Sequence, residues 1–213
     1  MSNPLAYHAS TRSEVAALLP PFAGRVLEIG CGTGATLSFL KESGRCAWTG
    51  GVELVPAAHA VAAARLDQSW CGNIETLDLG LPDGELDAVL CLDVLEHLAD
   101  PWSVTARLTA LLKPGGVLIA SIPNIRHYKV ALGLLLHGRW EYEDSGILDR
   151  THLRFFVRAT AIELLTRSGL RVDHVRPLLA LKKGKLKWLL NQASGERLND
   201  SFAIQYLLRG VKP

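Results

Sequence analysis

The chain has 213 residues, of which 48% are hydrophobic and 21% are charged, and its formal net charge is +2 at pH 7. The apolar content excludes a disordered chain, and the small net charge gives no reason to expect a nucleic-acid partner. No apolar run is long enough to cross a bilayer, and residues 1–12 lack the apolar stretch of a signal peptide. The four cysteines form no C-x-x-C pair, so we expect a cytoplasmic protein with reduced thiols.

Apolar runs alternate with helix-compatible segments along the chain. The expected strands are residues 25–29, 46–53, 69–74, 86–92, 117–122, 170–175 and 202–209. The expected helices are residues 13–19, 35–43, 56–66, 101–112 and 160–168, with a turn at residues 113–116. Asp100 and Pro101 are typical of a helix start, and Thr160 with Glu163 matches a capping box. This alternation predicts an α/β fold with parallel strands and helices on both faces of the sheet.

The segment Val26–Gly34, V-L-E-I-G-C-G-T-G, is the most informative motif. An apolar strand breaks there into glycines at every second position, and a helix follows. Glycines at such a place permit a tight turn and let a ligand approach the backbone closely. We therefore expect a nucleotide-like ligand at the helix start.

Two carboxylates indicate which nucleotide-like ligand this is. Glu53 follows the glycines by about 20 residues, where an acid accepts hydrogen bonds from ribose hydroxyls. Glu28 lies near the end of the first strand, where it would repel a pyrophosphate but could receive an ammonium group. The sequence therefore favours an adenosine with a cationic amino-acid tail. Ala35 leaves the looser dinucleotide pattern satisfied, so a nicotinamide-dependent (NAD) oxidoreductase is an alternative.

Four motifs in chain order resemble class I S-adenosylmethionine-dependent methyltransferases. They are the glycine-rich turn, Cys71–Ile74, Leu86–Pro101 and Leu112–Gly116. The resemblance covers Phe22 to about Asn124. It implies one methyltransferase domain over residues 1–213, with a doubly wound, Rossmann-like seven-stranded sheet, strand order 3-2-1-4-5-7-6 and an antiparallel seventh strand. It also implies S-adenosylmethionine as the cofactor and demands no metal; a non-catalytic cofactor-binding partner protein is an alternative.

The resemblance also implies a set of cofactor contacts. Asn73 stands where the family usually has an aspartate that reaches the adenine amino group. Its side-chain oxygen can still accept that hydrogen bond, although an asparagine that only shapes a turn is the alternative. Residues 94–98 resemble a recurrent helix start in the family. The implied cofactor-binding residues are Glu28, Gly30, Cys31, Gly32, Gly34, Glu53, Leu54, Asn73, Ile74, Leu92, Asp93 and Val94.

A long connection follows the fifth strand, and we expect residues 124–157 to form a lid or substrate-binding insertion with an apolar helix at 132–136. The string at 146–156 resembles a bacterial subgroup described as methionine-biosynthesis-W-like or glycan-cluster methyltransferases. That resemblance does not supply a substrate. We expect a small-molecule or glycan acceptor, with oxygen rather than nitrogen as the methylated atom.

Two histidines of this insertion are candidate catalytic bases. A histidine with a near-neutral pKa can take a proton from an attacking hydroxyl or amine. We expect His152 to do so, with His127 as the second candidate. The alternative is that residues 149–152 form a polar latch that fixes the insertion to the sheet edge.

The terminal segments complete the predicted domain. Residues 1–21 are expected to form an N-terminal helical segment. Residues 181–190 are basic and partly amphipathic, which is typical of a solvated helix face. The alternative is weak contact of this segment with a membrane surface or an anionic substrate.

Overall fold

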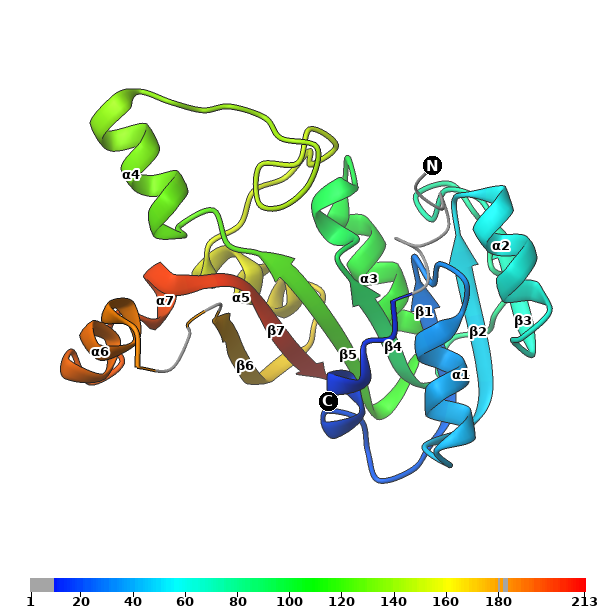
Figure 1. The fold of residues 1–213 in the computed structure, drawn as a ribbon. Helices are drawn as coiled ribbons and strands as arrows, with labels where there is room; N and C mark the ends of the chain where they lie inside the picture. Colours follow the sequence, from blue (N-terminus) through cyan, green and yellow to red (C-terminus); the bar gives the residue numbers. More distant parts are fainter. Residues whose placement is uncertain (1–9, 180, 182–183) are drawn as a thin grey trace.

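The computed structural model describes residues 10–179, 181 and 184–213 (Figure 1). The strands are β1 (Ala23–Ile29), β2 (Cys46–Glu53), β3 (Gln68–Cys71), β4 (Leu86–Leu92), β5 (Leu112–Pro123), β6 (Arg171–Leu179) and β7 (Ala203–Val211). The helices are α1 (Ala35–Glu42), α2 (Pro56–Ala63), α3 (Pro101–Leu111), α4 (Tyr128–His137), α5 (Arg158–Arg167), α6 (Leu186–Ala193) and α7 (Asn199–Phe202). Two short 3-10 turns are η2 (Ser13–Ala17) and η3 (Leu95–His97).

One seven-stranded sheet runs through the molecule in the order β3-β2-β1-β4-β5-β7-β6. β1 to β5 pair in parallel, and β7 runs antiparallel to both β5 and β6. The predicted strand order and the antiparallel seventh strand are therefore confirmed.

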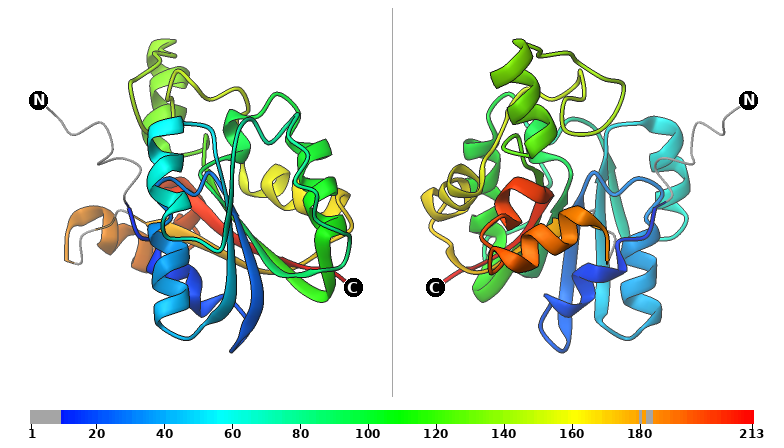
Figure 2. Two further views of the ribbon diagram at one scale, coloured as in Figure 1. Left: turned by 90° about the vertical axis from the view of Figure 1, so that its right-hand side faces the viewer. Right: turned by 60° about the vertical axis from the view of Figure 1, so that its left-hand side comes forward.

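Helices cover both faces of this sheet (Figure 2). Neighbouring residues of one strand point to opposite faces, so Val26 belongs to the core cluster that contains residues of η2, α1 and α2, while Leu27 belongs to the cluster that contains residues of α3 and α5. Both side chains are fully buried. This two-sided burial explains why β1 and β4 read as continuous apolar runs rather than as alternating patterns.

Several boundaries differ from the prediction. β3 ends at Cys71 instead of Ile74, because the chain turns at Gly72 and Asn73. Residues 113–116 are a bulge inside β5 rather than a separate turn, since β4 pairs with β5 on both sides of them. β6 continues past the predicted end through Pro177, which an edge strand accommodates because one side of it needs no hydrogen-bond donors.

The helix start predicted at Asp100 and Pro101 is confirmed, since α3 begins at Pro101 and the Asp100 carboxylate accepts a hydrogen bond from Ser103 N. Residues 94–98 contain only the short turn η3, and the helix start predicted at Thr160 was wrong. α5 begins at Arg158, so Thr160 lies inside its first turn, and its hydroxyl accepts a hydrogen bond from Val157 N. At the N-terminus, the predicted helix 13–19 is the 3-10 turn η2, and residues 1–9 lie outside the described residues.

The segment between β5 and α5, residues 124–157, is called the insertion below. It contains α4, which includes the predicted apolar run 132–136, yet none of the residues of α4 is buried. Figure 1 shows α4 standing away from the sheet, with the rest of the insertion arching back toward α3. Of the basic segment 181–190, residues 182–183 lie outside the described part of the chain, and α6 begins at Leu186. No described helix combines the length and the apolar character that crossing a membrane requires.

Candidate active site

A cavity of about 1020 Å³ opens where β1, β2 and β4 end. The carboxyl ends of parallel strands are the usual ligand-binding edge of such sheets. All the predicted cofactor residues except Gly34 line this cavity. The N-terminal segment contributes Ser10 and Arg12 to its wall, and the insertion contributes Asp144, Asp149 and Thr151.

The turn after β1 needs its glycines for conformation and for space. Gly30, Gly32 and Gly34 have φ angles of 69°, 55° and 76°, which side-chain-bearing residues rarely adopt. A Cβ atom on Gly30 would also lie 2.6 Å from Cγ2 of Val94. Gly34 packs against Leu66 instead of facing the cavity, so it shapes the turn from behind.

Glu53 joins the first two strand ends through its side chain. One carboxylate oxygen accepts a hydrogen bond from Gly32 N at 2.8 Å, and the other accepts one from Val55 N at 2.8 Å. A carboxylate has about four acceptor positions, so both oxygens can still receive a ribose hydroxyl. The side chain thus fixes the glycine turn and retains the acceptor capacity that the sequence suggested.

Glu28 is a buried carboxyl group with an unsatisfied oxygen. It is 4% exposed, lines the cavity, and its Oε2 has no hydrogen-bond partner among the described residues. Burial raises its pKa to about 8, an effect that Arg12 opposes and Glu53 reinforces. A buried polar group without a partner is costly, and a cationic ligand group in the cavity would satisfy it.

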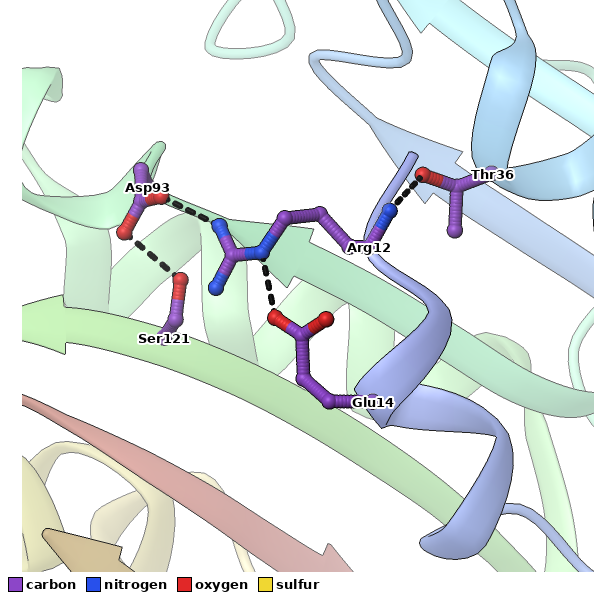
Figure 3. A network of polar contacts seen from close by, with 5 residues as sticks. All are labelled: Arg12, Glu14, Thr36, Asp93 and Ser121. Atoms are coloured by element: carbon purple, nitrogen blue, oxygen red, sulfur yellow. Dashed lines mark hydrogen bonds and ion pairs between the residues drawn. The ribbon is translucent and has the colours of Figure 1, made fainter. Parts of the chain in front are cut away.

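Arg12 was missed in the sequence, although it lines the cavity. Its guanidinium lies 2.5 Å from Asp93 Oδ2 and 2.6 Å from Glu14 Oε1, and its backbone N donates to Thr36 Oγ1 (Figure 3). Asp93 has a positive φ of 58° and accepts a hydrogen bond from Ser121. No sequence pattern connects residues 12 and 93, so only the fold could reveal this pair.

Asn73 occupies a turn at the cavity wall. Its side-chain oxygen accepts a hydrogen bond from Glu75 N at 2.9 Å, and its backbone oxygen accepts one from Leu77 N. The turn that was kept as an alternative is therefore present. The turn uses one acceptor position of the side-chain oxygen, so Asn73 retains a second acceptor position on Oδ1 and the Nδ2 amide as a donor.

The two candidate bases lie outside the cavity lining. His152 is 8% exposed and packs edge-on against His97, with ring centroids 4.7 Å apart. His97 is the histidine that lines the cavity, and burial lowers its pKa. His127 is buried elsewhere, against the ring of Tyr128.

The contacts that a polar latch requires are present at residues 149–152. The Asp149 carboxylate accepts hydrogen bonds from Thr151 N and Oγ1, and Thr151 contacts Nδ1 of His97. Backbone N–H groups of Leu153 and Arg154 donate to the carbonyl oxygen of Glu96. The insertion is thereby attached to η3, at the rim of the cavity.

Comparisons with known proteins agree with this site. The family described as "Methyltransferase domain" matches residues 7–175. The ubiquinone biosynthesis O-methyltransferase of Xanthomonas axonopodis pv. citri is 29% identical over 215 residues, covering 93% of this chain and 80% of the relative. The protein of the same name from Idiomarina loihiensis is 34% identical over 120 residues, covering 54% of this chain and 48% of the relative.

Solved structures share the fold. An S-adenosylmethionine-dependent methyltransferase from Archaeoglobus fulgidus has a TM-score of 0.66 at 21% identity, with 97% of this chain and 96% of that chain covered. A methyltransferase of the same cofactor class from Mesorhizobium loti has a TM-score of 0.65 at 18% identity, with coverages of 93% and 96%. The glycine turn, the unsatisfied Glu28 and the match over most of the chain lead to one conclusion: the chain belongs to the methyltransferase domain family and is an S-adenosylmethionine-dependent methyltransferase.

Proposed function

We propose that the protein methylates an oxygen atom of a small-molecule acceptor. The observation that carries the site assignment is Glu28, a buried carboxyl with an unsatisfied oxygen on the cavity wall. The relatives that resemble this chain are named O-methyltransferases, which supports oxygen as the methylated atom. Acceptance of a glycan stays a prediction, because neither the cavity nor these names bear on it.

Different residues of the cavity bind different parts of the cofactor. Glu28 receives the ammonium group of the amino-acid tail, and Glu53 accepts hydrogen bonds from the ribose hydroxyls. Asn73 and Ile74 contact the adenine. When bound, the cofactor supplies a methyl group on a positively charged sulfur. The last residue of β4 and the two residues after it, Leu92 to Val94, form the wall on the side of that methyl group.

The remaining task of the chain is to position the acceptor and exclude water. In-line methyl transfer requires alignment of the reacting atoms more than it requires a chemical group from the protein. The insertion contributes Asp144, Asp149 and Thr151 to the cavity, so it is the part that would contact the acceptor. A base role for His152 or His127 stays a prediction, because neither side chain lines the cavity.

Calorimetric titration tests the cofactor assignment. Wild-type protein should bind S-adenosylhomocysteine and not NADH, because only the first has an ammonium group that can pair with the Glu28 carboxyl. Glu28→Gln should weaken binding by about tenfold or more, the scale of one hydrogen bond to a charged group. Glu85→Gln is the control, since Glu85 is partly exposed and pairs with Arg25 away from the cavity.

Two outcomes would contradict the cofactor assignment: NADH binding without S-adenosylhomocysteine binding, or equal affinity in the wild type and Glu28→Gln. The acceptor is tested separately with a labelled methyl donor and matched pairs of small molecules that differ only in a hydroxyl or an amine. Label should enter the hydroxyl compounds. Label found only in the amines would overturn the proposal for oxygen.

A further inference from the structure

Three side chains of the kinds that bind metal ions lie close together where the insertion joins η3. Glu96 and His97 come from η3, and His152 comes from the insertion. One ligand atom from each residue lies within 4.8 Å of the ligand atoms of the other two. The cluster is adjacent to the cavity, because His97 also lines the cavity wall.

Glu96 contributes a buried carboxylate to the cluster. The residue is 1% exposed, and neither carboxylate oxygen has a hydrogen-bond partner among the described residues. A carboxylate that is buried without a partner destabilises the fold or takes up a proton. The carbonyl oxygen of the same residue accepts the hydrogen bonds from Leu153 and Arg154, so the backbone holds the carboxylate in this place.

Nδ1 of each histidine lies near a backbone carbonyl oxygen that can accept a hydrogen bond from it. Nδ1 of His152 lies 3.1 Å from the carbonyl oxygen of Ile147, and Nδ1 of His97 lies 3.3 Å from that of Thr151. An imidazole that donates Nδ1–H to a backbone carbonyl presents an unprotonated Nε2. Metal-binding histidines are commonly fixed by this kind of outer hydrogen bond.

We propose that Glu96, His97 and His152 bind one divalent transition-metal ion, with zinc as the best match. Two imidazoles and one carboxylate form a ligand set that zinc uses in proteins, whereas magnesium and calcium prefer oxygen ligands alone. Tetrahedral bonds of about 2.1 Å place ligand atoms about 3.4 Å apart. Side-chain rotations that bring the atoms closer by up to about 1.4 Å would close the site around the ion.

This site also bears on the role of His152. An imidazole that ligates a metal through Nε2 and donates a hydrogen bond through Nδ1 has no nitrogen left to act as a base. In the metal-bound protein, His152 would fasten the insertion to η3. The ion would thus complete the polar latch, independently of which acceptor the enzyme methylates.

Cobalt(II) is the probe for this site, because its visible absorption reports nitrogen and oxygen ligands in a tetrahedral arrangement. Untagged protein is treated with a chelator, dialysed and titrated with cobalt(II), and zinc is then added as a competitor. The wild type should show visible bands that saturate at about one equivalent and disappear when zinc is added. Glu96→Gln and His152→Gln should each weaken binding by at least about tenfold.

His127→Gln is the matched control, because His127 is another buried histidine of the insertion and lies outside the cluster. Its cobalt titration should equal that of the wild type. Absence of saturable bands in the wild type, or equal weakening by all three substitutions, would overturn the proposal.

The thermal unfolding of the wild type gives a second readout if the variants do not fold. An ion that binds only the folded protein raises the unfolding temperature, so one equivalent of zinc should raise it. An unchanged or lowered unfolding temperature would overturn the proposal without any variant.

Discussion

The ionisation of Glu28 is coupled to the ligand that the cavity binds. Its pKa of about 8 means that the empty cavity holds this carboxyl mostly protonated at pH 7. An ammonium group beside it favours the carboxylate and lowers that pKa. Binding of S-adenosylhomocysteine at pH 7 should therefore release a proton, and the affinity should rise between pH 6 and pH 8.

Calorimetry in two buffers with different ionisation enthalpies measures this proton release. The observed enthalpy should depend on the buffer in the wild type, and this dependence should be smaller in Glu28→Gln. A buffer dependence of equal size in both proteins would assign the proton to another group.

Gly30 combines a backbone constraint with a steric one, and the chain offers a glycine that separates the two. Gly30 and Gly44 share a φ of 69°, but a Cβ atom would meet Val94 only at Gly30 and has no atom within 4 Å at Gly44. Gly44→Ala should cost about 1 kcal/mol of unfolding free energy from backbone strain. Gly30→Ala should cost about 1–3 kcal/mol more, because the neighbouring side chain must move.

Urea unfolding monitored by circular dichroism measures both free energies. Equal losses in the two variants would mean that a Cβ atom at position 30 has no steric cost against Val94.

At the scale of elements, the N-terminal segment is a wall of the cavity, and the Arg12 side chain ties it to the end of β4. Arg12 bridges Asp93 after β4 and Glu14 in η2. Arg12→Ala should weaken binding of S-adenosylhomocysteine by about fivefold, equivalent to ~1 kcal/mol, because the segment loses its ion pair with Asp93. Amide hydrogen exchange of residues 10–17 should become faster in the same variant.

Arg167→Ala is the control for Arg12→Ala. Arg167 forms an exposed ion pair with Glu163 within α5, and its removal should leave the affinity unchanged. If both substitutions have the same effect, or neither has one, the N-terminal segment does not contribute to binding.

Element boundaries could be predicted only where local patterns determine them. β2 and β4 were predicted to the residue, since a buried apolar run ends at a polar or glycine-rich segment. The bulge in β5 was predicted to be a turn, because a proline followed by two glycines, Pro114 to Gly116, is typical of a turn and of a bulge alike. The membrane contact of residues 181–190 stays a prediction.

At the scale of the whole molecule, the strand order followed from the family resemblance, whereas contacts between distant segments could not be predicted. Arg12 and Asp93 are separated by 81 positions, and no local rule links them. His152 was recognised in the sequence, but its neighbours Glu96 and His97 become visible only when the insertion folds back on η3. The glycine turn, Glu28 and Glu53 were recognisable because their spacing reflects the geometry of two adjacent parallel strands.

The central claim is that the ends of β1 and β2 bind the two ends of one ligand, its amino-acid tail at Glu28 and its ribose at Glu53. A crystal structure grown with saturating S-adenosylhomocysteine tests this most directly. The account predicts the ammonium group within hydrogen-bonding distance of the Glu28 carboxylate, about 3 Å, and both ribose hydroxyls on Glu53. An empty cavity, or a ligand whose amino-acid tail lies away from Glu28, would contradict it.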